Sequence, residues 1–187
     1  MRIFIAIDVP EEIKEKAAGT EQEMKKIQGA FTFVSKEAMH ITLNFIGEVD
    51  SNITQNAKRA LDSIAFAPFE VSLRGLSYFS PGFIRVVYIG VDKGKDELVR
   101  LFSLVGEALD NESVPYEHSN KEIDSFTPHF TLARVKYVRD KKPLLEFISK
   151  HAKDDFGAFI VKGMALKQST LTEKGPAYSN IHEVLFK

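Results

Sequence analysis

The sequence predicts an α+β protein of two lobes, which are related by a pseudo-twofold axis and each hold an antiparallel sheet with flanking helices around a central cleft. Two observations lead to this prediction. Short apolar segments of strand length alternate with longer segments, rich in Glu and Lys, that have a helical pattern. The order of segments and motifs in the first half of the chain also recurs in the second half.

The first half of the chain is expected to alternate strands with helices. Strands are predicted at residues 2–9, 31–34, 40–46 and 69–79. Gly47 is expected to close the third of these strands. Pro10 opens a helix that runs to about residue 27, because proline is favoured in the first helical turn. Ser51 or Asn52 caps a second helix, which runs to about residue 65.

The second half is expected to follow the same alternation. The turn signal Ser80-Pro81-Gly82 separates the last strand of the first half from the first strand of the second. Strands are predicted at residues 83–91 and 129–135, and helices at about 95–109 and 141–150. The chain is expected to end in a hairpin that joins residues 158–171 to 179–186 around Glu173-Lys174-Gly175-Pro176.

Two short patterns recur at nearly the same spacing. His40-Ile41-Thr42-Leu43 returns as His129-Phe130-Thr131-Leu132, 89 residues later. A second pattern, Leu73-Arg74-Gly75-Leu76-Ser77, is matched 88 residues later by residues of the same types, Val161-Lys162-Gly163-Met164-Ala165. One four-residue recurrence arises easily by chance, whereas two in register with a common order of elements do not.

We therefore interpret the chain as one domain with an internal repeat. The copies that form the lobes are about residues 1–80 and 83–170, and a C-terminal strand at about 179–186 is added to them. The length of 187 residues, with 44% hydrophobic and 27% charged residues, is typical of a globular chain that folds without disulfides or metal.

Composition excludes several classes of function. The net charge of −1 gives no bulk attraction to nucleic acid or to a membrane surface. The chain has no cysteine, which excludes disulfides, thiol catalysis and thiolate metal sites. Apolar runs such as Ile3–Ile7 are far too short to span a membrane, and the first residues do not form an export signal. We expect a soluble cytoplasmic protein.

The repeated His-x-Thr-x motif predicts a chemical site. Residues two apart on a strand project from the same face, so each motif presents an imidazole and a hydroxyl to one side. The residues between them, such as Ile41 and Phe130, then point to a core. A single pair of this kind is most simply a His and a Thr on a solvated sheet face. Two pairs at matched places in a repeat favour a shared cleft.

Two histidines that face one cleft suit proton transfer in both directions. Imidazole titrates at about 6.5, so one ring can accept a proton while the other donates one. Threonine hydroxyls beside them can donate to phosphate oxygens, which favours phosphoryl transfer without a metal or another cofactor. Metal ligation by the histidines is the competing interpretation. It is weaker, because the sequence has no His-x-x-Glu, His-Glu-x-x-His or His-x-Asp cluster.

The motifs resemble those of the two-histidine (2H) phosphoesterases, and most closely the RNA 2′,3′-cyclic phosphodiesterases, historically called 2′-5′ RNA ligases. The resemblance covers nearly the whole chain in order, and tryptophan, which is frequent in the family at position 34, is replaced here by valine. The segments that carry it are Met1-Arg2-Ile3-Phe4-Ile5-Ala6-Ile7, Phe33-Val34 to Phe45-Ile46-Gly47, Phe126-Thr127-Pro128-His129-Phe130-Thr131-Leu132-Ala133-Arg134, and Ser169-x-Leu171 with Gly175-Pro176-x-Tyr178.

The resemblance implies hydrolysis of a 2′,3′-cyclic phosphate to a 2′-phosphate in a concave cleft, without metal. It implies that His40 is the proton donor and His129 the proton acceptor. Thr42 and Thr131 are implied to bind the phosphate oxygens. Arg134 fits the family's phosphate-holding arginine, but its parity on a strand is opposite to that of His129, so a bend is needed for it to reach the site.

The expected partner is an RNA that ends in a 2′,3′-cyclic phosphate, or a small cyclic nucleotide, bound by a monomer that does not contact membranes. Reverse ligation of 2′-5′ linkages is a possible second activity. The alternatives are a non-catalytic RNA- or nucleotide-binding module that uses the same cleft, and a metal-dependent phosphodiesterase.

Other conspicuous residues have simpler interpretations. The remaining histidines are expected to be surface or packing residues: His118, His151 and His182. A basic stretch could contact an RNA backbone or form a solvated strand–helix junction: Arg134, Lys136, Arg139, Lys141 and Lys142. Aromatic residues near the first turn are expected to be core more often than a stacking platform for a base: Tyr78, Phe79 and Phe83.

Overall fold

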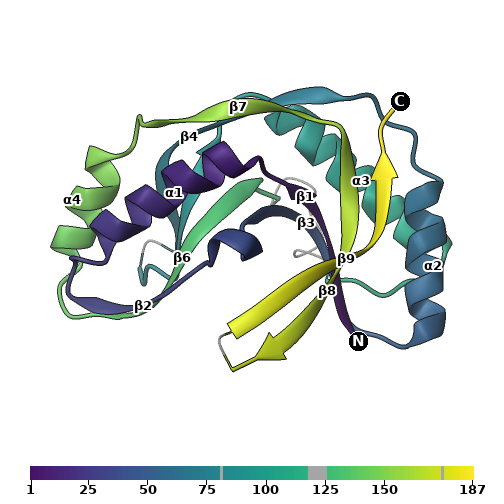
Figure 1. Ribbon diagram of the computed structural model, residues 1–187, viewed down its shortest axis with the longest axis horizontal. Helices are drawn as coiled ribbons and strands as arrows, with labels where there is room; N and C mark the ends of the chain where they lie inside the picture. The colour runs from purple at the N-terminus through teal and green to yellow at the C-terminus, as the bar shows by residue number, and fades with distance from the viewer. Residues whose placement is uncertain (81, 118–125, 174) are drawn as a thin grey trace.

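The computed structural model describes residues 1–80, 82–117, 126–173 and 175–187, and it confirms the α+β prediction. Within these residues the strands form one curled, nine-stranded sheet (Figure 1). The strands are β1 (Arg2–Asp8), β2 (Gly29–Phe33), β3 (His40–Glu48), β4 (Phe69–Phe79), β5 (Val86–Val91), β6 (His129–Val138), β7 (Asp155–Val161), β8 (Gly163–Thr172) and β9 (Gly175–Leu185).

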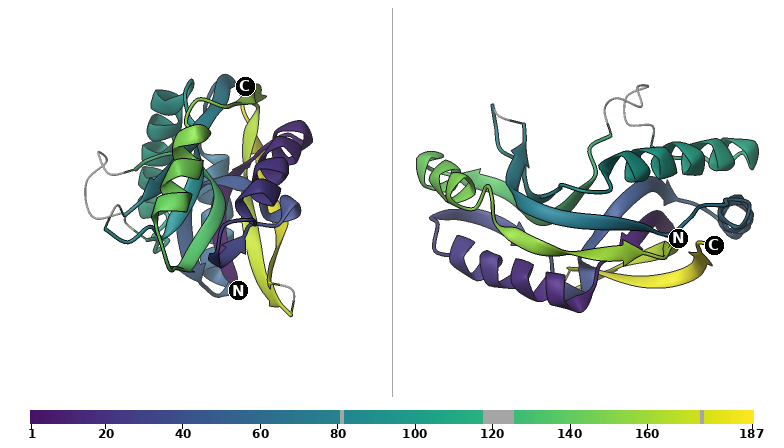
Figure 2. Two further views of the ribbon diagram at one scale, coloured as in Figure 1. Left: turned by 90° about the vertical axis from the view of Figure 1, so that its left-hand side faces the viewer. Right: turned by 90° about the horizontal axis from the view of Figure 1, so that it is seen from above.

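Four α-helices in the described residues cover the sheet. They are α1 (Glu11–Met24), α2 (Ser51–Asp62), α3 (Lys95–Asn111) and α4 (Lys142–Lys150), and a short 3-10 helix, η1 (Lys36–Ala38), precedes β3. Figure 1 shows α1 and α4 at one end of the molecule and α2 and α3 at the other. In both views of Figure 2 strands lie between α1 and α3. No helix in the described ranges is long and apolar enough to cross a membrane.

The order of strands places the two histidine-bearing strands at the centre. Eight of the nine strands follow the order β7-β4-β5-β6-β3-β1-β8-β9, and β2 lies off this path and pairs with β6. All of these strand pairs are antiparallel. On either side of the central pair β6–β3 follow β5 and β1, and then β4 and β8. The strands that carry the recurring sequence patterns therefore occupy equivalent places about a pseudo-twofold axis.

The two halves of the sequence exchange a strand. β4 belongs to the first half but pairs with β5 of the second, and β8 of the second half pairs with β1 of the first. Each side of the sheet thus contains strands from both halves of the chain. The division at residues 1–80 and 83–170 stays a prediction about the sequence repeat, and the exchange joins these segments into one sheet.

Some predicted boundaries were wrong for local reasons. The predicted strand 158–171 is two strands, β7 and β8, because the chain changes its partner from β4 to β1 at Lys162. A side chain on Gly163 would collide with the backbone carbonyl of Val184, so β9 approaches closely where β8 begins. Gly47 does not end β3 but lies inside it with φ +93°, near a break in the β1–β3 register.

Two other termini also differ from the prediction. α2 is capped by Asp50, whose carboxylate accepts a hydrogen bond from the Ile53 N–H at 2.9 Å, rather than by Ser51 or Asn52. β5 begins at Val86 instead of residue 83, and the predicted turn includes Pro81, which lies outside the described residues. Neither difference moves the central strands.

Glu21 of α1 provides a test of the packing between helix and sheet. The residue is 6% exposed, and Oε1 has no hydrogen-bond partner among the described residues. Burial raises the pKa of Glu21 from 4.5 to about 7, against the opposing charge of Lys25. Because the folded-state pKa is the higher one, the protein loses stability as the pH rises from 4.5 through 7.

We expect Glu21→Gln to raise the free energy of unfolding by about 2 kcal/mol at pH 8 and by much less at pH 4, where the carboxyl is protonated in both states. Urea unfolding at the two pH values measures this difference. Glu12→Gln, a change at an exposed position of the same helix, controls for effects on the helix itself. An equal gain at both pH values would contradict the burial effect.

Candidate active site

The two motif histidines begin the two central strands. His40 is the first residue of β3 and His129 the first residue of β6. The strands pair through Ile41 and Phe130, which are register partners and fully buried. Because neighbouring strands lie roughly 5 Å apart, the residues that flank this pair come close together on the opposite face of the sheet. The structure thus brings together His40, Thr42, His129 and Thr131.

Each histidine ring is held in the same way. Nδ1 of His40 donates to the carbonyl oxygen of Ala38 at 2.7 Å, and Nδ1 of His129 donates to that of Thr127 at 2.8 Å. A carbonyl can only accept, so Nδ1 carries the hydrogen in both rings. The Nε2 atom of each ring is therefore the one left for proton transfer. The acceptor is in both cases the residue two positions earlier, as expected from a repeated unit.

Thr42 forms a hydrogen bond with the histidine of its own motif. The Thr42 hydroxyl lies 2.9 Å from Nε2 of His40, and it donates to this nitrogen when the ring is neutral. Thr131 projects from the same face of β6 as His129, where its register partner on β5 is Tyr88. Thr42 and Thr131 are both partly buried. This arrangement can bind an anion between the two strands.

Arg134 reaches the site face because β6 contains a bulge. Relative to β5, β6 carries an extra residue between Thr131 and Ala133, so that Leu132 and Ala133 are both buried. The bulge reverses the alternation of side chains beyond it. Arg134 is consequently exposed on the same face as Thr131, although the sequence spacing alone assigns it to the opposite one.

The same bulge in β3 reveals a residue that sequence reasoning missed. Leu43 and Asn44 are both buried, and Phe45, which follows them, is 41% exposed on the face of Thr42. Phe45 stands 89 residues before Arg134, so it occupies the equivalent place in the repeat. That correspondence is the signal that could have identified it. The site therefore has a cation on the His129 side and an exposed aromatic ring on the His40 side.

Aromatic rings surround the imidazole of His40. The ring centroids of Phe4 and Tyr178 lie 4.9 Å and 5.3 Å from that of His40. Phe4 is buried, whereas Tyr178 comes from the β8–β9 hairpin, far away in sequence. Together they exclude water from one side of the ring.

His129 has a similar aromatic surround. Phe79 and Tyr88 lie 4.9 Å and 5.3 Å from its ring, and they stack on each other at 4.3 Å. Phe79, one of the aromatics near the first turn, therefore packs beside the catalytic candidate. Phe83 is 49% exposed and carries Arg85 over its ring, 5.7 Å from the centroid.

Burial controls the charge of both rings. It lowers the pKa of His40 to about 4, with the Ala38 carbonyl opposing this effect. The pKa of His129 is also lowered, first by burial and then by the charge of Arg134, against the Thr127 carbonyl. His40 is therefore neutral at pH 7 in the free protein. A bound phosphate anion favours the imidazolium and so supplies the condition under which His40 can donate a proton.

The other histidines pack elsewhere. His151 is 6% exposed and its Nδ1 lies 2.6 Å from the Asp154 carboxylate. His182 contacts Asp62 at 2.7 Å, and His118 lies outside the described residues. Among the residues that the structure describes, no three His, Asp or Glu side chains gather as they would to hold a metal ion.

Known proteins match this chain over its full length. The family model "LigT like Phosphoesterase" matches residues 7–88. A protein of Methanocaldococcus jannaschii named RNA 2′,3′-cyclic phosphodiesterase is 38% identical over 98% of this chain and 99% of its own. One of the same name from Archaeoglobus fulgidus is 36% identical over 97% and 98%.

Solved structures share the fold. The crystal structure of TT0787 of Thermus thermophilus has a TM-score of 0.78 at 27% identity, covering 100% of this chain and 98% of that one. The structure of Escherichia coli LigT complexed with 3′-AMP has a TM-score of 0.76 at 21% identity, covering 99% and 97%. The curled sheet with its central strand pair is thus a fold found in solved structures.

Proposed function

Because the chain belongs to the family of LigT-like, two-histidine phosphoesterases, we propose that it hydrolyses 2′,3′-cyclic phosphates of RNA ends or of nucleosides to 2′-phosphates. The observation that carries the proposal is the pair His40 and His129, set on adjacent strands with Nε2 of each ring available. Full-length relatives bear the name of this activity.

In the proposed reaction the two histidines act on opposite sides of the phosphorus. Nε2 of His129 takes a proton from water, and the water oxygen forms a bond to phosphorus. The bond from phosphorus to the 3′-oxygen breaks, and Nε2 of protonated His40 gives its proton to that oxygen. The product keeps the phosphate on the 2′-oxygen. Solvent then returns the two rings to their starting protonation states.

The neighbouring polar groups hold the phosphate during this exchange. The hydroxyls of Thr42 and Thr131 and the guanidinium of Arg134 are assigned to its non-bridging oxygens, where charge is greatest in the transition state. Arg134 lies on the His129 side, so it also disfavours premature protonation of the base. Phe45 lies on the His40 side, where the leaving ribose and its base are placed.

The finer features of the proposal concern the partner and its place in the cell. We assign to the chain an RNA end, rather than only a free cyclic nucleotide, as its partner, because its relatives are named for RNA. We further propose a monomeric cytoplasmic enzyme that uses no metal or other cofactor and that can run the reaction backward to form 2′-5′ linkages. The main alternative is a module that binds the same ligand without turnover.

The test is product analysis in the presence of a chelator. The protein is incubated with 2′,3′-cyclic AMP, and separately with a short RNA that ends in a cyclic phosphate, in excess EDTA. The expected product is 2′-AMP or the 2′-phosphorylated RNA. The His40→Ala/His129→Ala double variant, prepared in the same way, controls for contaminating nucleases.

Other outcomes would select another function. Binding of 2′,3′-cyclic AMP without turnover would identify a binding module. Activity that is lost in EDTA and restored by a divalent cation would identify a metal-dependent phosphodiesterase. Formation of 3′-AMP would mean that the other phosphorus–oxygen bond is cleaved.

A further inference from the structure

A buried lysine lies in the wall of the site. Lys167 of β8 is only 7% exposed, although a lysine ammonium is seldom buried unless it is paired. Its Nζ lies 2.8 Å from Oδ1 of Asp8 and donates to Oδ1 of Asn180 at 2.6 Å. Asn180 in turn donates to Oδ2 of Asp8 at 3.3 Å and to Oε1 of Glu183 at 2.7 Å. These residues form a connected polar network across β1, β8 and β9.

The network adjoins the ring of His40. Asp8 is the register partner of His40 in the β1–β3 pair, so their Cβ atoms are roughly 5 Å apart on one face. Lys167 is the register partner of Phe4, whose ring centroid lies 4.9 Å from that of His40. The ion pair therefore stands directly behind the histidine that is assigned as the proton donor.

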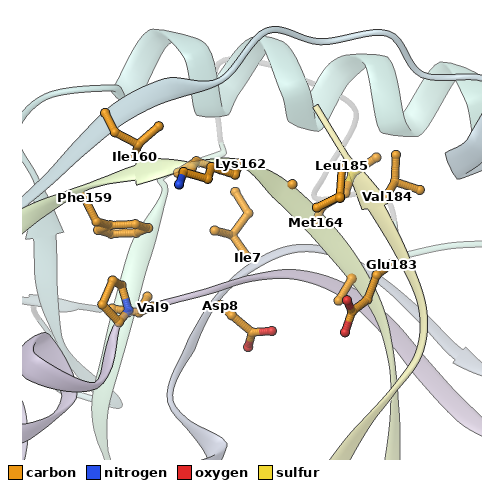
Figure 3. Close-up of a pocket in the computed structure, with 14 residues that line it drawn as sticks. Ile7, Asp8, Val9, Phe159, Ile160, Lys162, Met164, Glu183, Val184 and Leu185 are labelled. Carbon is orange, nitrogen blue, oxygen red and sulfur yellow. The ribbon is translucent and has the colours of Figure 1, made fainter. Parts of the chain in front are cut away.

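The same network borders a pocket of about 370 Å³ (Figure 3). Asp8 and Glu183 line it together with apolar residues of β7, β8 and β9. In Figure 3 both carboxylates lie in the lower part of the pocket, apart from Ile160 and Leu185. Asp8 is half-exposed at this pocket, whereas Lys167 is shielded, so the two charges of the pair are screened by water to different degrees.

In the part of the chain that the structure describes, no ion pair occupies the equivalent place beside His129. Its register partner on β5 is Gly90, where His40 has Asp8. Phe79 takes the place in the repeat that Lys167 takes in the other half. The repeat would place the same groups beside both rings if they served only to hold the sheet together. Within the described ranges these groups accompany His40 alone, which points to different tasks for the two histidines.

We propose that Asp8 and Lys167 are positioning residues that together set how tightly His40 holds its proton. Lys167 disfavours a proton on the ring, and Asp8 favours it. This inference rests on the proposed function, in which His40 must bind a proton and then release it to the leaving oxygen. The pair keeps the proton affinity of the His40 ring at an intermediate value. If this affinity were too low, His40 would not bind the proton, and if it were too high, His40 would not release it.

The other charges near His40 support this assignment. Burial has the largest effect on the pKa of His40 and lowers it, and the hydrogen bond to the Ala38 carbonyl, which raises it, comes second. The charges follow in the order Lys167, which lowers the pKa, Asp8, which raises it, and Lys14 of α1, which lowers it. Burial raises the pKa of Asp8, but the hydrogen bond and charge of Lys167 outweigh this and lower it, so Asp8 is ionised at neutral pH. Glu183 reaches the pair through Asn180.

The experiment compares variants that change one charge each. In Lys167→Met, the pKa of His40 in the ligand-free protein is expected to rise by about half a unit or more, because the larger of the two lysine charges that lower it is removed while Asp8 remains. In Asp8→Asn, it is expected to fall. NMR titration of the imidazole resonances measures both. In the pH profile of kcat, the alkaline limb follows the pKa of His40 in the complex. This limb is expected to move to higher pH in Lys167→Met and to lower pH in Asp8→Asn.

Controls separate this effect from general changes. His129 is an internal control, and its pKa is expected to stay in place in both variants. Lys93→Met removes a lysine from an exposed pair with Glu70, and it should leave His40 unchanged. If Lys167→Met does not fold because Asp8 loses its partner, Asp8→Asn, at a half-exposed position, decides the matter.

The inference is overturned if the pKa of His40 changes in neither variant, or if it changes in the same direction in both. It is also overturned if the pKa of His129 changes as much as that of His40. The titration requires no turnover. A responsive His40 in a protein that fails to hydrolyse 2′,3′-cyclic AMP would therefore support this inference and reject the proposed function, whereas turnover with an unresponsive His40 would do the reverse.

Discussion

Replacement of either motif histidine by alanine is expected to lower kcat at least about 100-fold, because each change removes a general acid–base contribution of that order. His40→Ala removes the donor to the leaving oxygen, and His129→Ala removes the acceptor of the water proton. Binding of the product 2′-AMP should weaken much less, since Thr42, Thr131 and Arg134 remain in place. Initial rates with 2′,3′-cyclic AMP and calorimetric titration with 2′-AMP measure the two effects.

A matched control is available in His182→Ala. His182 is a surface histidine in contact with Asp62 and lies outside the motifs, so its replacement should leave kcat within about twofold. Near-normal turnover in either motif variant would reject the paired mechanism. A loss of 2′-AMP binding as large as the loss of turnover would assign the histidines to binding instead.

Arg134→Met is expected to raise KM for 2′,3′-cyclic AMP about tenfold or more, because a hydrogen bond from a charged donor to phosphate contributes about 1.5–3 kcal/mol. The aliphatic part of the side chain is kept, and so is the bulge at Leu132 and Ala133. A fall in kcat is expected as well, because the charge on the oxygens assigned to Arg134 is greatest in the transition state. Steady-state kinetics at the pH optimum measure both parameters.

Arg139→Met serves as the control for Arg134→Met. Arg139 is exposed just beyond the end of β6 and belongs to the same basic stretch, but it is placed outside the phosphate site. Its loss should leave the kinetics with a mononucleotide unchanged. Equal effects of the two substitutions would show that Arg134 acts only through the general charge of the surface.

The part of the site that depends on strand periodicity could be predicted from the sequence. The alternation of His40 with Ile41 and of His129 with Phe130 follows from two residues per strand repeat, and burial has the predicted sense at each position. The repeat also predicted that equivalent strands would meet at a pseudo-twofold axis. These features need only local pattern and internal symmetry.

Features that depend on irregular or distant contacts could not be predicted in this way. The bulges that turn Arg134 and Phe45 to the site face depend on how β6 and β3 pair with their neighbours, and a single strand does not encode this clearly. The exchange of β4 and β8 between the halves depends on the closing of the whole sheet. The contact of Asp8 with Lys167 joins residues from opposite ends of the chain.

The most direct test of the assigned roles is the pH dependence of the residual rates in the two histidine variants. The wild-type rate should rise and then fall with pH, because one ring must be neutral and the other protonated, and the two apparent pKa values belong to the coupled pair. Since burial lowers the pKa of His40 to about 4 in the free protein and phosphate raises it in the complex, the optimum of kcat should lie at a higher pH than that of kcat/KM.

In the wild type, protonation of the base His129 stops the reaction at low pH. His129→Ala removes this base, so the acidic limb of the residual pH–rate profile should become flat. By the same reasoning His40→Ala should flatten the alkaline limb. Flattening of the opposite limbs would exchange the two roles. Residual rates that keep both limbs in both variants would contradict the mechanism, because other groups would then carry the protons.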